Sequence, residues 1–131
     1  MSTAYVESSA LTKVVLDEPE SSALRDALRG HERWVSSDLT AVEVTRAAAR
    51  ARGEEGRARA RAALVPIGAL SIDRAVVALA ARLEPRTLRS LDAIHVATAL
   101  TLAPDELVFY SYDSRTVDAA REAGLDVASP S

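Results

Sequence analysis

Short apolar runs alternate with helical patterns along the whole chain. The run at residues 4–6 stops at Glu7. Leu11 and Val15 then recur at helical spacing, which predicts a helix directly after a strand. This alternation continues to the end of the chain without the short turns that mark hairpins. We expect strands at residues 4–6, 34–35, 66–71, 107–110 and 125–128, and helices at residues 8–16, 21–30, 40–64, 72–83, 90–102 and 114–123.

Strands that alternate with helices predict an α/β fold with a mainly parallel sheet and helices on both faces, in three α/β/α layers. The length of 131 residues fits a single domain over residues 1–131. Gly53 and Gly56 interrupt one long helical pattern in a charged turn, so we expect a helical hairpin at about residues 40–64.

The helix expected at residues 90–102 has almost no polar face and should be buried. Ser90 fits its N-cap, Asp92 lies in its first turn, and Pro104 should end it. Asp92 and His95 lie one turn apart on the same side, so both need polar partners inside the protein. The helix dipole alone could stabilise Asp92. His95 fits a satisfied core histidine better than a metal ligand.

Four acids lie where strands end or helices begin. Glu7 and Asp113 follow two of the expected strands, and Glu43 and Asp92 lie in the opening turns of two helices. Parallel sheets bind ligands beyond the carboxyl ends of their strands, so these acids are candidates for a site. Glu43 also has a purely structural interpretation, because Thr40 and Glu43 match a capping box.

Composition restricts the class of protein. With 48% hydrophobic and 27% charged residues, the chain has the make-up of an ordinary globular protein. The absence of cysteine excludes disulfides and thiolate metal sites, so oxygen or imidazole must hold any metal. No apolar run is long enough to span a membrane and no secretion signal is recognisable, so we expect a cytoplasmic protein.

The charge of the chain is unevenly distributed. A formal net charge of −3 argues against nucleic-acid binding by the whole surface. Arginines nevertheless crowd one segment, where they form either a solvated helical face or an RNA contact. These are Arg46, Arg50, Arg52, Arg57, Arg59 and Arg61.

Four segments resemble the motifs of one family, in the order in which that family has them. The stretch LRSLDAIHVATAL at residues 88–100 resembles a helix-opening motif of PIN-domain ribonucleases of the VapC toxin type. The other three are AYVESSALTKVVLDEP at residues 4–19, SSDLTAVEVTRA at residues 36–47 and FYSYDSRTVDAAREAGLDV at residues 109–127. Together they cover nearly the whole chain.

The resemblance implies a PIN-like fold with strand order 3-2-1-4-5 and an endoribonuclease that forms the toxin of a toxin–antitoxin pair. It also implies a homodimer and a small antitoxin whose tail enters the acidic groove. Matching residue to motif assigns Glu7, Glu43, Asp92 and Asp113 to metal binding and water activation. Around them, the candidates for orienting the carboxylates are Ser9, Thr40 and Ser111, and those for contacting RNA are Arg115, Lys13, Arg46 and Arg50.

Four converging carboxylates need a cation, because like charges raise one another's pKa. Oxygen ligands with retained water suit Mg²⁺, and Mn²⁺ accepts similar ligands. Such an ion can activate a water for attack on phosphorus and neutralise charge on the departing oxygen. Metal-dependent hydrolysis of RNA phosphodiester bonds is therefore the expected reaction.

Glu7 departs from the family pattern, which has Asp at this position. The carboxylate is kept but lies one methylene farther from the backbone. This leaves room for a tuned site, for a weakened enzyme, or for a module that binds RNA or antitoxin without efficient turnover. A phospho-receiver domain is also α/β with acids at strand ends, but it needs a lysine beyond its late strands, and Lys13 is the one lysine here.

Overall fold

Five parallel strands form the single sheet of this protein, described here from a computed structural model that covers residues 2–102 and 106–131. The strand order is β3-β2-β1-β4-β5, which confirms the predicted fold class and order. Each neighbouring pair is parallel, and Thr3 of β1 lies opposite Arg33 of β2 and Leu107 of β4. The strands are β1 (Thr3–Val6), β2 (Arg33–Ser37), β3 (Ile67–Leu70), β4 (Leu107–Tyr110) and β5 (Asp126–Ala128).

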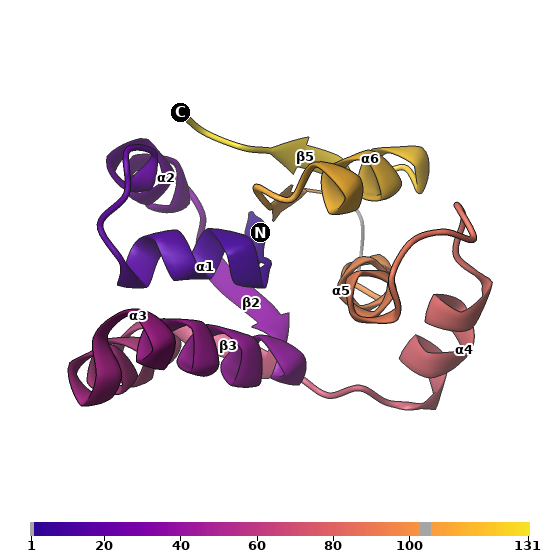
Figure 1. Cartoon of the computed structure of the whole chain (residues 1–131). Helices are drawn as coiled ribbons and strands as arrows, with labels where there is room; N and C mark the ends of the chain where they lie inside the picture. The colour runs from indigo at the N-terminus through magenta and orange to yellow at the C-terminus, as the bar shows by residue number, and fades with distance from the viewer. Residues whose placement is uncertain (1, 103–105) are drawn as a thin grey trace.

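Helices cover both faces of the sheet and give it three layers (Figure 1). On one side lie α1 (Ser8–Val15), α2 (Ser21–Leu28) and α3 (Asp38–Leu64). On the other lie α4 (Arg74–Arg82), α5 (Ser90–Leu100) and α6 (Ser114–Glu122). Among the described residues, no helix is both long enough and apolar enough to cross a membrane.

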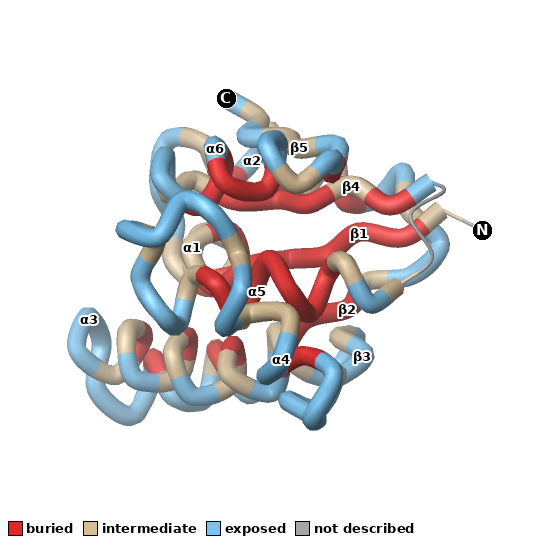
Figure 2. Tube along the Cα trace, turned by 90° about the vertical axis from the view of Figure 1, so that its right-hand side faces the viewer, coloured by how far each residue is buried: buried red, intermediate tan, exposed pale blue. Residues whose placement is uncertain are grey.

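Alternating side chains of β1 supply the two hydrophobic cores, as the period of two in a strand requires. Ala4 and Val6 pack with α1, α2 and α3 in one core. Tyr5 packs with Phe109, α5 and α6 in the other. Figure 2 shows β1, β4 and α5 buried along most of their length. The burial of α5 was predicted from its lack of a polar face.

Two helix starts differ from the sequence prediction. The N-cap of α3 is Ser37, which accepts a hydrogen bond from the backbone of Leu39 at 3.1 Å, so the helix begins before Thr40. The N-cap position of α5 is Arg89 instead of Ser90, and its side chain makes no capping bond. The predicted stop at Pro104 falls outside the described residues.

A sharp bend divides α3. Arg52 and Gly53 leave helical geometry, and Gly53 has a φ of 57°, which favours glycine. Beyond the bend, Gly56 lies against the backbone of Ala48, where an added Cβ would stand 2.0 Å from the carbonyl oxygen. Glycine at position 56 therefore lets the second arm of α3 pack directly on the first.

Candidate active site

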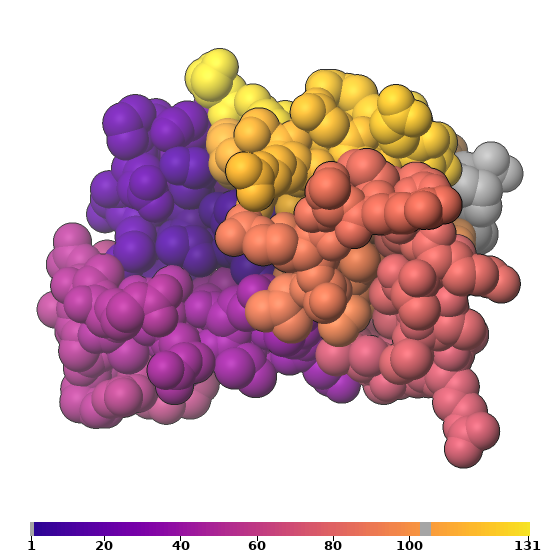
Figure 3. All heavy atoms as spheres, turned by 45° about the vertical axis from the view of Figure 1, so that its right-hand side comes forward, coloured from indigo at the N-terminus to yellow at the C-terminus, as the bar shows by residue number. Residues whose placement is uncertain are grey.

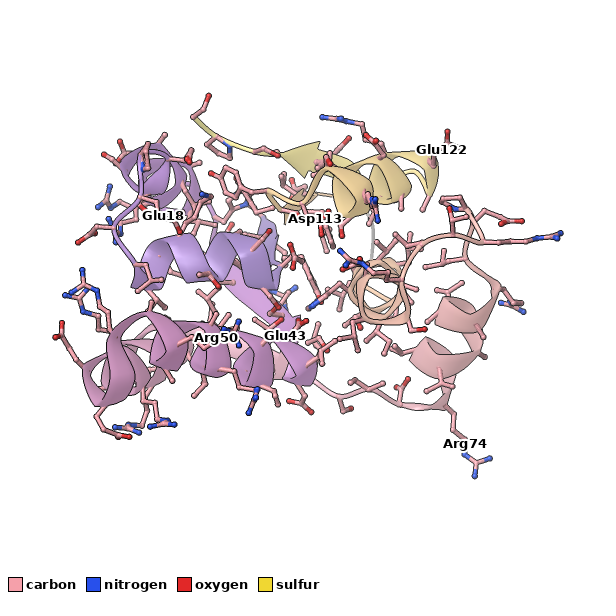
Figure 4. All side chains as sticks on the ribbon, viewed as in Figure 1. Glu18, Glu43, Arg50, Arg74, Asp113 and Glu122 are labelled. Atoms are coloured by element: carbon pink, nitrogen blue, oxygen red, sulfur yellow. The ribbon has the colours of Figure 1, made fainter. Side chains whose placement is uncertain are left out.

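The acids chosen from the sequence lie around the carboxyl end of the sheet. Glu7 directly follows β1, and Asp113 follows β4 as the N-cap of α6. Glu43 lies in the second turn of α3, and Asp92 in the first turn of α5. Figure 4 shows Glu43 and Asp113 coming from α3 and from the start of α6, on either side of α1. The neighbouring position of β1 and β4 places the ends of these strands side by side.

Glu7 is held tightly by hydrogen bonds. Its side chain caps α1, accepting from the backbone N–H of Ser9 at 3.1 Å and from the Ser9 hydroxyl at 2.5 Å. The Ser111 hydroxyl donates to the same carboxylate at 2.6 Å. The residue is 4% exposed. Ser9 and Ser111 therefore fix the Glu7 carboxylate between the ends of β1 and β4.

Glu43 is held by donors from two other helices. The Ser8 hydroxyl donates to Oε1 at 2.5 Å, and Nε2 of His95 lies 2.7 Å from the same oxygen. Burial alone would raise the pKa of Glu43, but the hydrogen bonds from His95 and Ser8 outweigh burial and lower it. Glu43 thus stays ionised at neutral pH.

The capping-box interpretation of Thr40 and Glu43 is wrong. Thr40 lies inside α3, where its hydroxyl contacts the Ser36 hydroxyl at 2.6 Å. The Ser8 hydroxyl approaches Thr40 at 3.4 Å, so Thr40 is linked to Glu43 only through Ser8. The box fails because the helix starts three residues earlier than the pattern suggested, at Ser37.

His95 is buried behind the acids, 1% exposed. Its Nδ1 lies 2.9 Å from the hydroxyl of Tyr5, which stacks on Phe109. Burial raises the pKa of Tyr5 far above its ordinary value, so this phenol keeps its proton. Nε2 of His95 lies 4.0 Å from Glu7 as well as 2.7 Å from Glu43. The partners that the sequence required for a buried histidine are therefore present.

Asp92 and Asp113 share a cationic neighbour. The Nε of Arg89 lies 3.4 Å from Asp92, and its Nη2 lies 3.8 Å from Asp113. Asp113 also accepts a hydrogen bond from the backbone N–H of Arg115 at 3.0 Å. Since the Arg89 side chain is 67% exposed, these ion pairs are open to exchange with other cations.

The four acids thus form two neighbouring pairs, which Ser111 links by bonding both to Glu7 and to the backbone N–H of Asp113. Within residues 2–102 and 106–131, no three His, Cys, Asp or Glu side chains converge closely enough to hold a metal ion together. The donors are nevertheless all oxygens, which suit a hard divalent cation. The guanidinium of Arg89 already places positive charge between Asp92 and Asp113, where such a cation would bind.

The residues proposed to contact RNA differ in their exposure and in whether an acid already pairs with them. Lys13 pairs with Glu18 and Glu20 and lies over the ring of Tyr112, so its charge is already compensated. Arg115 lines a cleft of about 670 Å³ between α6 and the chain before α5. Arg46 and Arg50 are exposed and line a smaller hollow together with Arg57. Figure 4 shows Arg50 farther along α3 than Glu43.

Three residues of the site were not predicted from the sequence, namely Tyr5, Ser8 and Arg89. Tyr5 and Ser8 lie two residues before and one after Glu7, yet strand and cap patterns explained both of them. Arg89 precedes the helix of Asp92, where a charge near the first turn could have suggested an ion pair. Only the folded chain shows that His95 of α5 meets Tyr5 and Ser8, and that Arg89 reaches Asp113. Figure 3 shows the face on which α1, α3 and α5 come together.

Comparison with known proteins gives concordant matches. The model of the PIN domain family matches residues 4–122. Ribonuclease VapC46 of Mycobacterium tuberculosis is 44% identical over 131 residues, which cover 100% of both chains.

Two solved structures share the fold at low sequence identity. A toxin-antitoxin complex from Klebsiella pneumoniae has a TM-score of 0.73 and 21% identity, covering 99% of this chain and 98% of the other. VapC20 of M. tuberculosis, described as a Sarcin-Ricin loop cleaving toxin, has a TM-score of 0.70 and 14% identity. That match covers 93% of this chain and 95% of VapC20.

Proposed function

Because this chain belongs to the PIN-domain family and to its VapC branch, we propose that it is a divalent-metal-dependent endoribonuclease, the toxin of a toxin–antitoxin pair. The observation that carries the proposal is the gathering of Glu7, Glu43, Asp92 and Asp113 at the carboxyl end of one parallel sheet.

Glu7, Asp92 and Asp113 are the residues that would hold Mg²⁺ or Mn²⁺, with Glu43 beside them. The bound ion would lower the pKa of a water and neutralise charge on the leaving oxygen. Access to Asp92 and Asp113 requires Arg89 to give way, and its exposed side chain has room to do so. The donor chemistry supports this assignment, since four carboxylates present only hard oxygen ligands.

Glu43 is the residue that we assign to accept a proton from the attacking water. Both of its hydrogen bonds end on Oε1, so within the described residues Oε2 has no hydrogen-bond partner. Its lowered pKa keeps the carboxylate ionised, and its side chain is 31% exposed. Glu7 is almost fully buried and accepts three hydrogen bonds, which suits a fixed ligand better than a group that exchanges protons.

RNA is the proposed substrate and a small antitoxin the proposed partner, in the cytoplasm where both occur. The ribonuclease name of VapC46 and the toxin–antitoxin complex from K. pneumoniae support these two assignments. Arg46, Arg50 and Arg115 are exposed and are proposed to contact phosphates. A homodimer is also proposed, because apolar side chains remain exposed on three helices for a second copy to cover. These are Val42, Val77 and Leu91.

The test is cleavage of total RNA by the purified protein with Mg²⁺, with Mn²⁺ or with a chelator, followed by mapping of the fragment ends. We expect defined ends that need a divalent ion. Asp92→Asn should abolish cleavage. Asp26→Asn is the matched control, because Asp26 is an exposed acid on α2 that pairs only with Arg29. Cleavage that persists in the chelator, or in Asp92→Asn, would contradict the proposed site.

Glu7 favours one second candidate function, a PIN-fold module that binds RNA or antitoxin with weak turnover. The extra methylene carries the Glu7 carboxylate onto Ser9 and Ser111, and both of its oxygens accept hydrogen bonds there. A carboxylate so engaged is less free to move onto a metal. Wild-type protein that binds an RNA oligonucleotide but releases no fragments with either metal would favour this function over the ribonuclease.

A further inference from the structure

A continuous line of hydrogen bonds runs from the interior of the protein to the acids at the carboxyl end of the sheet. It consists of Tyr5, His95 and Glu43. The Tyr5 hydroxyl lies 2.9 Å from Nδ1 of His95, and Nε2 lies 2.7 Å from Oε1 of Glu43. Tyr5 and His95 are both almost completely buried. Glu43 is the member of the line nearest to solvent.

The proton on Nε2 of His95 can be assigned from the chemistry of its hydrogen-bond partners. The Tyr5 phenol is protonated, and its hydroxyl lies within hydrogen-bond distance of Nδ1. Nε2 faces the ionised Glu43 carboxylate and must carry the proton, because two acceptors at 2.7 Å would repel each other. His95 thus donates its Nε2–H to Glu43, while the Tyr5 hydroxyl holds the other side of the ring.

The contact between His95 and Glu43 joins the two helical layers. His95 belongs to α5, one turn after Asp92, whereas Glu43 belongs to α3 on the opposite face of the sheet. The same Nε2 lies 3.1 Å from the Ser8 hydroxyl at the start of α1. A single imidazole therefore sets the position of Glu43 relative to the helix that carries Asp92.

Two other roles for His95 agree less well with these contacts. A metal ligand needs an unprotonated nitrogen open to the ion, but Nδ1 is taken by Tyr5 and Nε2 by Glu43. A residue that only filled the core would be apolar in most proteins, because each buried polar atom must find a partner. Both ring nitrogens instead have side-chain partners, and one of these is a site acid.

We propose that His95 is a positioning residue, whose Nε2–H orients Glu43 and fixes its spacing from Asp92, with the Tyr5 hydroxyl holding the other side of the ring. The proposal rests on the proposed nuclease function of the four acids. His95 contacts neither RNA nor metal and acts only through Glu43. Such residues behind a metal site commonly change metal affinity or activity about 10- to 100-fold when replaced.

The test compares two substitutions that each keep one half of the histidine. His95→Gln places an amide N–H near the position of Nε2 and retains a donor for Glu43. His95→Asn places its amide near Nδ1 and retains a partner for Tyr5, but it loses the hydrogen bond to Glu43. Tyr5→Phe removes the hydroxyl that contacts Nδ1 and keeps the ring that stacks on Phe109. Ser21→Ala is the control, a buried hydroxyl of α2 that bonds only to chain atoms around α1 and α2.

Three measurements apply to each variant: ¹⁵N spectra of the imidazole rings, Mg²⁺ affinity by calorimetry, and kcat and KM on an RNA oligonucleotide. The wild-type spectrum should show His95 protonated at Nε2, with its signals separated from those of His31 by the variant His31→Gln. We expect His95→Asn to lower kcat about 10- to 100-fold with KM almost unchanged. His95→Gln should keep most of the activity, Tyr5→Phe should lower kcat less than His95→Asn, and Ser21→Ala should affect only the melting temperature.

A double-mutant cycle then separates positioning from general stability. In a Glu43→Gln background, His95→Asn should cause no further loss of Mg²⁺ affinity, because the residue acts only through Glu43. Three results would each overturn the proposal. They are additive losses of Mg²⁺ affinity in the cycle, equal losses of kcat in the Asn and Gln variants, and a wild-type His95 ring protonated at Nδ1 but not at Nε2. If the wild type binds Mg²⁺ but cleaves no RNA, the nuclease proposal fails, and the ring spectrum and the Mg²⁺ cycle still decide the role of His95.

Discussion

The carboxylate of Glu7 lies one methylene farther from the backbone than that of an aspartate would. This extra length brings it within hydrogen-bond distance of two serines. Ser9 and Ser111 both donate to Oε1, and the backbone of Ser9 donates to Oε2. The longer side chain therefore stabilises the start of α1 and the end of β4 in a way that competes with metal binding. Local structure and catalysis make opposite demands on this single residue.

Glu7→Asp should raise RNA cleavage, and Glu7→Gln should lower both cleavage and metal affinity. Asp is also a good N-cap, so α1 keeps its start, while the carboxylate withdraws from Ser111. A displacement of about 1 Å can change rates on the order of 10²-fold, which sets the scale of the gain. Initial rates on a labelled RNA measure it. If Glu7→Asp cleaves no faster than an active wild type, the site is built around Glu.

Arg89→Ala should tighten Mg²⁺ binding, because the guanidinium competes for Asp92 and Asp113. The pair is exposed, so we expect an increase of about two- to fivefold, equivalent to roughly 0.5–1 kcal/mol for one surface ion pair. Calorimetric titration gives the affinity directly. Arg86→Ala is the control, since Arg86 is 93% exposed and pairs only with Glu84 at 3.7 Å. Equal affinities in wild type and Arg89→Ala would remove Arg89 from the site.

At the scale of elements, α3 combines one acid of the site with the arginine-rich surface. Glu43, Arg46 and Arg50 recur at three- and four-residue spacing, so they share one side of the first arm. Arg57 from the second arm lines the same hollow as Arg46 and Arg50. Basic side chains thus lead away from the acids along a single helix, on a protein whose net charge is −3.

Replacing Arg46 and Arg50 by Ala should make RNA binding less sensitive to salt. Each phosphate contact to a single strand contributes about 0.7 to the slope of log affinity against log salt, so two lost contacts should flatten it by about 1.4. Binding is measured in metal-free buffer, where no cleavage occurs. Arg74 and Arg82 of α4 supply a double variant of equal charge that should leave the slope unchanged. An unchanged slope in the α3 variant would make these arginines a solvated face.

Gly56→Ala should destabilise the protein, although alanine normally stabilises a helix relative to glycine by about 0.5–1 kcal/mol. The new Cβ would stand 2.0 Å from the carbonyl oxygen of Ala48, so the two arms of α3 must separate. We expect a loss of about 1–3 kcal/mol in the free energy of unfolding by denaturant. Gly68→Ala is the control, because its Cβ would meet Val35 at an ordinary 3.4 Å. A more stable Gly56→Ala would refute this packing of the arms.

At the scale of the whole molecule, the sequence predicted the layers, and its resemblance to a known family predicted the strand order. Strand and helix periods depend on local chemistry, so Leu107–Tyr110 was predicted with its observed bounds. The contacts of the site depend on packing between distant segments. Glu43 matched a local capping pattern, and only the approach of α5 shows that its carboxylate bonds to His95 instead. Arg89 was missed for the same reason, since Asp113 lies far from it in the chain.

His31 connects the N-terminal segment, the start of β2 and β4, and should make stability depend on pH. Its Nδ1 lies 2.7 Å from the Ser2 hydroxyl and its Nε2 lies 2.6 Å from the Tyr110 hydroxyl. Burial lowers the pKa of His31 below its ordinary value of 6.5. Below pH 6.5 the unfolded chain therefore binds more protons than the folded one, and stability falls as the pH falls.

The free energy of unfolding, measured by denaturant between pH 7.5 and pH 5, should decrease less in His31→Gln than in the wild type. The variant will be less stable at neutral pH, so the comparison concerns the pH slope and not the absolute value. Parallel pH profiles in the two proteins would mean that His31 has the same pKa in the folded and unfolded chains.

The central place of β1 also determines when the molecule can become active during its synthesis. Thr3–Val6 leave the ribosome well before their neighbours in β4, Leu107–Tyr110. Asp92 and Asp113 are likewise made long after Glu7. Pairing of such distant segments waits until both have been made. For the proposed ribonuclease, the messenger RNA under translation is therefore spared by its own nascent chain until β4 and Asp113 have emerged.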